Sequence, residues 1–95
     1  MARWKNCRTE SFYRDDESSC EVRINGSEIV VSYRDDSRWI TYRGNEVAPG
    51  HFELSSDHGG KATLHRSPDS DWLEGFWIES PEEGMWRIEL GEESD

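Results

Sequence analysis

The chain has 95 residues and a net charge of −10, from 21 acidic and 11 basic side chains, and hydrophobic residues make up 33% of it. This length predicts one domain over residues 1–95. The acidic balance argues against nucleic acid or a membrane as a partner, since both attract basic surfaces, and the 12% of aromatic residues argues against a wholly disordered chain.

The sequence has no segment of roughly 18 apolar residues that could span a membrane, and its N-terminus lacks the apolar core of a secretion signal. We therefore expect a cytoplasmic protein. Its two cysteines, Cys7 and Cys20, are then expected to be reduced thiols, with a disulfide between them as the alternative.

Short segments of alternating apolar and polar residues are separated by turn residues every 8–12 positions along the chain. This spacing predicts an all-β fold. We expect a mostly antiparallel meander of 7–8 strands that closes into a small barrel, with a β-sandwich as the alternative. Residues 1–10 and 91–95 are expected to fray, and Phe12 and Tyr13 are candidates for an added strand.

The first predicted hairpin joins residues 20–24 to residues 27–33 through the Asn-Gly pair at 25–26. Asn-Gly is the preferred pair for a two-residue type I′ turn. This turn pairs Val22 with Ile29 and places the apolar residues of both segments on one face.

The next turn pairs Tyr33 with Ile40 and continues the same apolar face, which leaves Trp39 on the outer face. Residues 44–50 contain two glycines and a proline and are predicted to form a loop. Val47 is expected to tuck inward from this loop.

Residues 51–54 and 61–65 form the next predicted pair of strands, with His51 opposite His65 on the outer face. Directly opposed side chains lie close enough for two imidazoles to share a metal ion. His58 lies in the connecting loop and supplies no third ligand, so we expect no metal site.

The motif E-G-x-W occurs twice near the end of the chain, in residues 74–77 and 83–86. A loop at residues 80–83 would make the two copies the strands of one hairpin, with Trp77 opposite Trp86. A glycine beside two indoles indicates room made for a large ring. The pair is interpreted as core, with a ligand-stacking pair or an internal repeat as alternatives.

The face predicted to point inward carries no charged side chain. Acid–base or nucleophilic catalysis needs titratable groups that converge in a cleft, so we expect no enzyme, no catalytic residue and no cofactor. The predicted inward residues are Cys20, Val22, Ile24, Ile29, Val31, Tyr33, Ile40, Tyr42, Phe52, Leu54, Ala62, Leu64, Leu73, Gly75, Trp77, Trp86, Ile88 and Leu90.

The opposite, outer face of the last hairpin is predicted to carry four large apolar side chains, namely Trp72, Phe76, Ile78 and Met85. Exposed apolar clusters on small proteins mark interfaces. Two expectations follow: either these residues form the interface of a homodimer, or the N-terminal segment around Trp4 and Phe12 folds over them.

The meander with its two G-x-W segments resembles the calycins, the lipocalin-like barrels that hold small apolar ligands. The phrase "GGKATLHR…LEGFWIE…EGMWRIEL", within residues 59–90, is also similar to small bacterial proteins of that shape. Lipocalins carry G-x-W on their first strand and are much longer, whereas here both copies lie at the end. The resemblance implies a barrel that binds a small ligand.

For function we expect a non-enzymatic binding domain that holds a small apolar or aromatic ligand near Tyr33, Tyr42, Trp77 and Trp86. The alternative is an acidic interaction module that acts as a homodimer or as an inhibitor of a basic protein partner.

Overall fold

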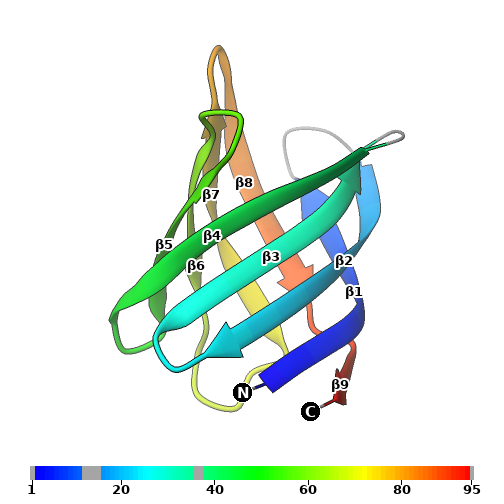
Figure 1. Cartoon of the computed structure of the whole chain (residues 1–95), viewed down its shortest axis with the longest axis vertical. Coiled ribbons are helices and arrows are strands. Elements are labelled where there is room, and N and C mark those ends of the chain that lie inside the picture. The colour runs from blue at the N-terminus through cyan, green and yellow to red at the C-terminus, as the bar shows by residue number, and fades with distance from the viewer. Residues whose placement is uncertain (1, 12–15, 36–37, 95) are drawn as a thin grey trace.

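The computed structural model describes residues 2–11, 16–35 and 38–94, which contain nine β-strands (Figure 1). In chain order these are β1 (Ala2–Ser11), β2 (Asp16–Asn25), β3 (Glu28–Asp35), β4 (Arg38–Ala48), β5 (His51–Ser56), β6 (Lys61–His65), β7 (Trp72–Glu79), β8 (Glu82–Glu89) and β9 (Glu92–Ser94). Phe12 and Tyr13 lie outside the described residues.

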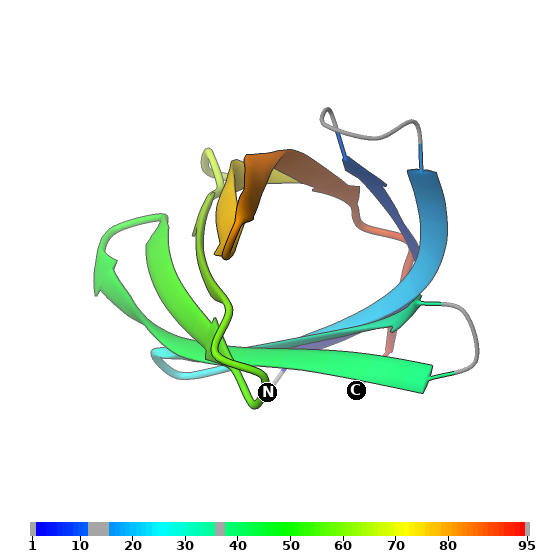
Figure 2. The same cartoon turned by 90° about the horizontal axis from the view of Figure 1, so that it is seen from above.

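The described strands form one antiparallel sheet in the order β2-β3-β4-β5-β6-β7-β8-β1-β9. The sheet curls strongly into a half-barrel, as the view from above shows (Figure 2). An all-β antiparallel meander is therefore confirmed, whereas the β-sandwich alternative is wrong, because the described strands belong to a single sheet.

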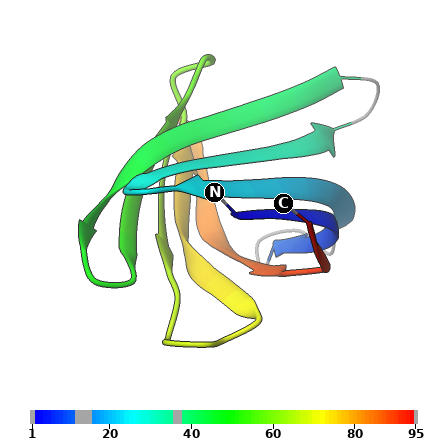
Figure 3. The same cartoon turned by 60° about the horizontal axis from the view of Figure 1, so that its bottom comes forward.

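The two chain ends lie next to each other because β1 pairs with three other strands. β1 pairs with β8 over Arg8–Ser11, with β2 along most of its length, and with β9 near its start (Figure 3). The β1–β2 ladder sets Cys7 opposite Cys20, with a register shift between Trp4 and Cys7. The segments expected to fray thus contain β1 and β9.

The core lies on the concave side of the sheet and agrees with the predicted inward face. Fifteen apolar residues form the core cluster, Ile24 and Tyr33 pack against it, and Gly75 is buried. Val30 is also buried, but on the outer face, where its ladder partners are Arg23 and Arg43. The long stems of arginine cover apolar surface in this way.

The turn between β2 and β3 lies one residue later than predicted. The loop residues are Gly26 and Ser27, because Asn25 pairs with Glu28. Gly26 has φ 64° and Ser27 has no positive φ, a pattern typical of a type II′ turn with glycine first. The predicted Val22–Ile29 pair is therefore wrong, and Val22 pairs with Val31.

Residues 44–48 continue β4 instead of forming a loop. Gly44 pairs with Ile29 on one side and with Leu54 on the other, and Val47 is 59% exposed at a register shift of the β4–β5 ladder. A bulge residue is left out of the pairing, so its side chain need not follow the alternation. The prediction that Val47 tucks inward is wrong.

The two E-G-x-W copies form a hairpin, but in a register shifted from the predicted one. The loop has only two residues, so Trp77 pairs with Gly84 and Gly75 pairs with Trp86. Each glycine therefore lies opposite the tryptophan of the other copy, and the predicted direct Trp77–Trp86 pair is wrong. Both indoles fit on one inner face because neither faces the other across the ladder.

Candidate functional site

Three of the four predicted ligand-binding residues form one aromatic cluster inside the half-barrel. The rings of Tyr33 and Tyr42 stack with centroids 6.4 Å apart, and the Trp86 indole lies 6.3 Å from Tyr33 and 5.6 Å from Tyr42. Trp77 is buried in the same core. Tilted and offset ring pairs at these distances are favourable, so the cluster fixes the orientation of the Tyr42 side chain.

The glycine opposite Trp86 allows the indole to reach a backbone carbonyl on the next strand but one. The indole Nε1–H of Trp86 on β8 donates to the backbone carbonyl of Thr63 on β6 at 3.2 Å. This hydrogen bond passes across β7, which lies between the two strands. The ladder partner of Trp86 on β7 is Gly75, and a Cβ at Gly75 would collide with the Thr63 carbonyl oxygen. The lack of a side chain at Gly75 therefore leaves the carbonyl accessible to the indole.

The hydroxyl of Tyr42 donates a hydrogen bond to Oε2 of Glu79, the last residue of β7. Burial raises the pKa of the Tyr42 phenol well above its ordinary value of 10.0. The hydrogen bond to Glu79 and the negative charge of the Glu79 carboxylate raise this pKa further. Tyr42 is therefore a protonated donor throughout the physiological pH range, and Glu79 is the acceptor.

A small pocket of about 170 Å³ lies beside this pair and is lined by residues from the β5–β6 and β7–β8 turns. Both turns lie at the top of Figure 1. The lining residues of the pocket are Ile40, Ser56, His58, Gly59, Glu79 and Ser80. The hydroxyl oxygen of Ser56 accepts from the backbone N–H groups of Gly60 at 2.9 Å and of His58 at 3.3 Å. The pocket thus combines an apolar wall, ordered polar loops and one carboxylate.

Glu79 was missed by the sequence analysis, although the alternation along β7 contained the signal. Leu73, Gly75 and Trp77 point inward, and Glu79 is the next residue on that face. The sequence places Glu79 at the end of the predicted strand, but the prediction ended the inward row at Trp77 and gave Glu79 no role. Tyr42 and Glu79 are 37 positions apart in the sequence. No local pattern predicts a hydrogen bond between residues so far apart.

The predicted interface residues lie on the outer face, as expected. Phe76, Ile78 and Met85 are 36%, 40% and 47% exposed, and Phe76 pairs directly with Met85. Trp72 is half-buried, with the guanidinium carbon of Arg87 4.5 Å from its ring centroid. Ala2–Ser11 lie within the sheet as β1, whereas Phe12 lies outside the described residues, so cover of the cluster by the segment around Trp4 and Phe12 stays a prediction.

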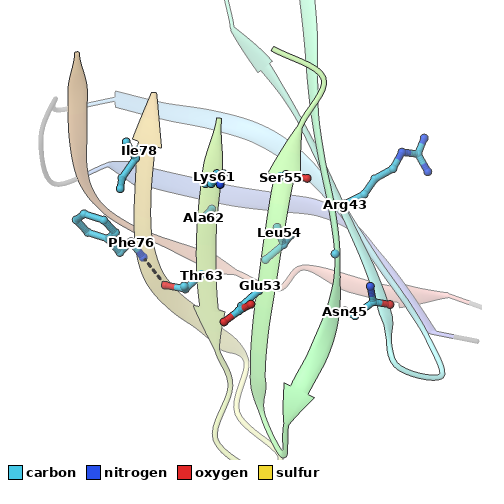
Figure 4. A pocket seen from close by; sticks show the side chains of 11 residues that line it. Arg43, Asn45, Glu53, Leu54, Ser55, Lys61, Ala62, Thr63, Phe76 and Ile78 are labelled. Atoms are coloured by element: carbon cyan, nitrogen blue, oxygen red, sulfur yellow. Dashed lines mark hydrogen bonds between the residues drawn. The ribbon is translucent and has the colours of Figure 1, made fainter. Parts of the chain in front are cut away.

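A broad open groove of about 520 Å³ crosses the outer face beside this cluster (Figure 4). Phe76 and Ile78 form its apolar side on β7, and the Phe76 amide donates to Oγ1 of Thr63 at 3.3 Å. Lys61 and Arg43 bring positive charge to the lining and Glu53 brings negative charge. The groove has mixed charge, in contrast to the strongly acidic chain.

His51 and His65 are ladder partners, as predicted, with ring centroids 4.4 Å apart in an edge-to-face arrangement. Both side chains are exposed. In the described part of the chain, no group of three or more His, Cys, Asp or Glu side chains is placed to hold a metal ion. The same residues include no helix that is both long and apolar enough to cross a bilayer.

Comparisons of the chain with protein-family models, with curated proteins and with solved structures gave no significant match. The resemblance to calycins therefore stays a prediction. Function has to be inferred from the residues and geometry of this chain itself.

Proposed function

We propose that this chain is a non-enzymatic binding domain that takes a small apolar or aromatic ligand at the end of the half-barrel. The observation that carries the proposal is the pocket beside the Tyr42–Glu79 pair, which adjoins the aromatic cluster. Ligand sites are concave, largely apolar and contain a few oriented polar groups. Ile40 supplies the apolar wall. Tyr42, which is buried against Tyr33 and Trp86, donates a hydrogen bond to the Glu79 carboxylate.

The hydrogen bonds at the pocket favour binding over catalysis. Activation of a serine nucleophile needs a base within hydrogen-bond reach of the hydroxyl. The Ser56 hydroxyl instead accepts two backbone N–H groups, and the Glu79 carboxylate accepts from Tyr42. These contacts order the loops and give the pocket a fixed shape.

A thermal-shift screen with fatty acids, flavonoids, nucleotides and small aromatic compounds tests the proposal. A ligand at about 100 times its Kd adds roughly 2.7 kcal/mol to the free energy of unfolding. For a domain of this size that raises Tm by about 10–20 °C. The proposal is withdrawn if no compound class raises Tm in a saturable manner.

A second candidate function is a protein interaction module, favoured by the exposure of Phe76, Ile78 and Met85 on one face. Apolar clusters of this kind mark interfaces, and a homodimer would cover the cluster. The acidic remainder of the surface would suit a basic protein partner, which the chain would bind as an inhibitor. Size-exclusion chromatography with light scattering separates a dimer from the 11.1 kDa monomer.

We further propose that the curled sheet closes in solution into a complete small barrel through β1. The pairing of β1 with both β8 and β2 supports closure. Hydrogen exchange of the Arg8–Ser11 amides tests it. Protection comparable to that of β3 is expected, and exchange at the rate of an unstructured peptide would contradict closure.

A further inference from the structure

Among the described residues that line the pocket at the end of the half-barrel, Glu79 is the one carboxylic acid. The inward row of β7 ends at this residue, so the carboxylate lies where the core meets solvent. Its ladder partner is Glu82 on β8. The side chain is half-buried, whereas a glutamate at a turn is normally fully solvated. Its position therefore calls for a reason beyond turn formation.

Two neighbours, Tyr42 and Gly60, lie against the Glu79 side chain. Tyr42 donates to Oε2, and the β5–β6 turn packs against the pair at Gly60. A Cβ built at Gly60 would meet the Tyr42 hydroxyl, Oγ of Ser56 at 2.9 Å and Cγ of Glu79 at 3.1 Å. The carboxylate is thus preorganised, which lowers the entropy lost when it binds a ligand.

Among the described residues that line the pocket, no lysine or arginine offers the carboxylate a counter-charge. The six lining residues contain one acid and one histidine, His58, whose side chain is exposed. A net charge of −10 raises the local concentration of cations around the whole molecule. Anions are disfavoured in this pocket on both grounds.

We propose that the pocket binds the ammonium group of a small primary amine whose body is apolar or aromatic. The ammonium donates to the Glu79 carboxylate, and the body lies against Ile40 and the loop residues Gly59 and Ser80. A volume of about 170 Å³ is below the roughly 300–1,000 Å³ of sites for drug-sized ligands, so the ligand is small. This inference rests on the proposed binding function and adds the charge of the ligand to it.

Isothermal titration calorimetry with three matched probes tests the proposal on the full chain. The probes are 2-phenylethylamine, the neutral 2-phenylethanol and the anionic 3-phenylpropionate, which share one aromatic body. We expect the amine to bind about tenfold more tightly than the alcohol, as a charge-assisted hydrogen bond implies. The carboxylate probe is expected to bind more weakly than the alcohol.

Two variants of equal charge locate the effect. Glu79→Gln keeps an acceptor for Tyr42 but removes the charge, and should bring the affinity for the amine down to that for the alcohol. Glu83→Gln removes the same charge from an exposed site in the same hairpin and should leave the preference for the amine unchanged. Tryptophan emission shows whether each variant is folded. The comparison of probes on the wild-type chain stands even if Glu79→Gln does not fold.

The outcomes separate this inference from the proposed function. If the alcohol binds as tightly as the amine, the ammonium proposal is overturned and the binding function stands. If no probe binds and the wider thermal-shift screen is also negative, both are overturned. If Glu83→Gln abolishes the preference as fully as Glu79→Gln, the preference comes from the overall charge and the site is wrong.

Discussion

Replacing Gly75 with alanine should destabilise the fold far more than an ordinary glycine substitution in a strand. Gly75 has no positive φ, so backbone conformation alone would permit alanine. The obstacle is the neighbouring strand, because the new Cβ would collide with the Thr63 carbonyl and would lie 3.0 Å from the Leu64 Cα. These are backbone atoms of β6, so β6 and β7 would have to move apart.

The magnitude follows from two losses at this position. Overpacking of a well-packed core costs typically 1–3 kcal/mol, and the collision here is with backbone, which places the cost at about 3 kcal/mol. Displacing the Thr63 carbonyl also weakens the hydrogen bond from Trp86, worth about 1 kcal/mol. A domain of 95 residues has about 5–14 kcal/mol of stability in total. A loss of 3–4 kcal/mol would lower Tm by about 12–30 °C.

Urea unfolding followed by tryptophan fluorescence measures this change, with Gly59→Ala as the control. Gly59 has φ 82° and no atom within 4 Å of a built Cβ. Alanine there should cost only the roughly 1–2 kcal/mol of a left-handed conformation. If Gly75→Ala proves no more destabilising than Gly59→Ala, the close approach of β6 and β7 is not as described.

Three further predictions concern the site and the outer face. Trp86→Phe loses the indole hydrogen bond to Thr63 and should lower the free energy of unfolding by about 2 kcal/mol in urea titrations; an unchanged midpoint would contradict this. Because the pKa of Tyr42 is raised in the folded chain, the unfolded chain releases this proton first as pH rises. Above about pH 10 the free energy of unfolding of the wild-type chain should therefore fall by up to 1.4 kcal/mol per pH unit more than that of Tyr42→Phe. Equal pH dependence of the two chains would refute the buried phenol. Met85→Glu should convert a homodimer into a monomer in light scattering while Ser67→Glu, on an exposed loop, should not, and a wild-type monomer at every concentration would remove the dimer.

The inward face could be predicted from the sequence even though two hairpin registers could not. In both hairpins each residue pairs with a partner two positions away from the predicted one, as when Val22 pairs with Val31 instead of Ile29. Side chains alternate with a period of two, so a shift of this size leaves every residue on its face. Only the neighbours change, and with them the meaning of Gly75.

The turns determined where sequence patterns failed. An Asn-Gly pair predicts a type I′ turn at 25–26, yet the chain uses Gly26 as the first loop residue. The difference in free energy between two turn types is smaller than the free energy gained when the strands that they join pack well. At Gly44 the glycine extends a strand, because its missing side chain admits the backbone of Glu53 and Leu54.

The aromatic part of the candidate site could be predicted, and its charged part could not. Alternation places Tyr33, Tyr42 and Trp86 inside, and their rings do meet. The contact between Tyr42 and Glu79 depends on the curl of the sheet, which brings the end of β7 beside β4. Curl is a property of the whole sheet and leaves no trace in one segment.

The most direct test of the proposed binding site is an NMR titration of the ¹⁵N-labelled chain with 2-phenylethylamine. A ligand beside Tyr42 and Glu79 should give saturable shifts of the Glu79, Gly60 and Ser80 amides, with a smaller shift of the Trp86 indole N–H through its contact with Tyr42. The amides around the outer groove at Phe76 should stay unchanged. Saturable shifts at the outer groove alone, or none at the pocket, would contradict the assignment of the binding site.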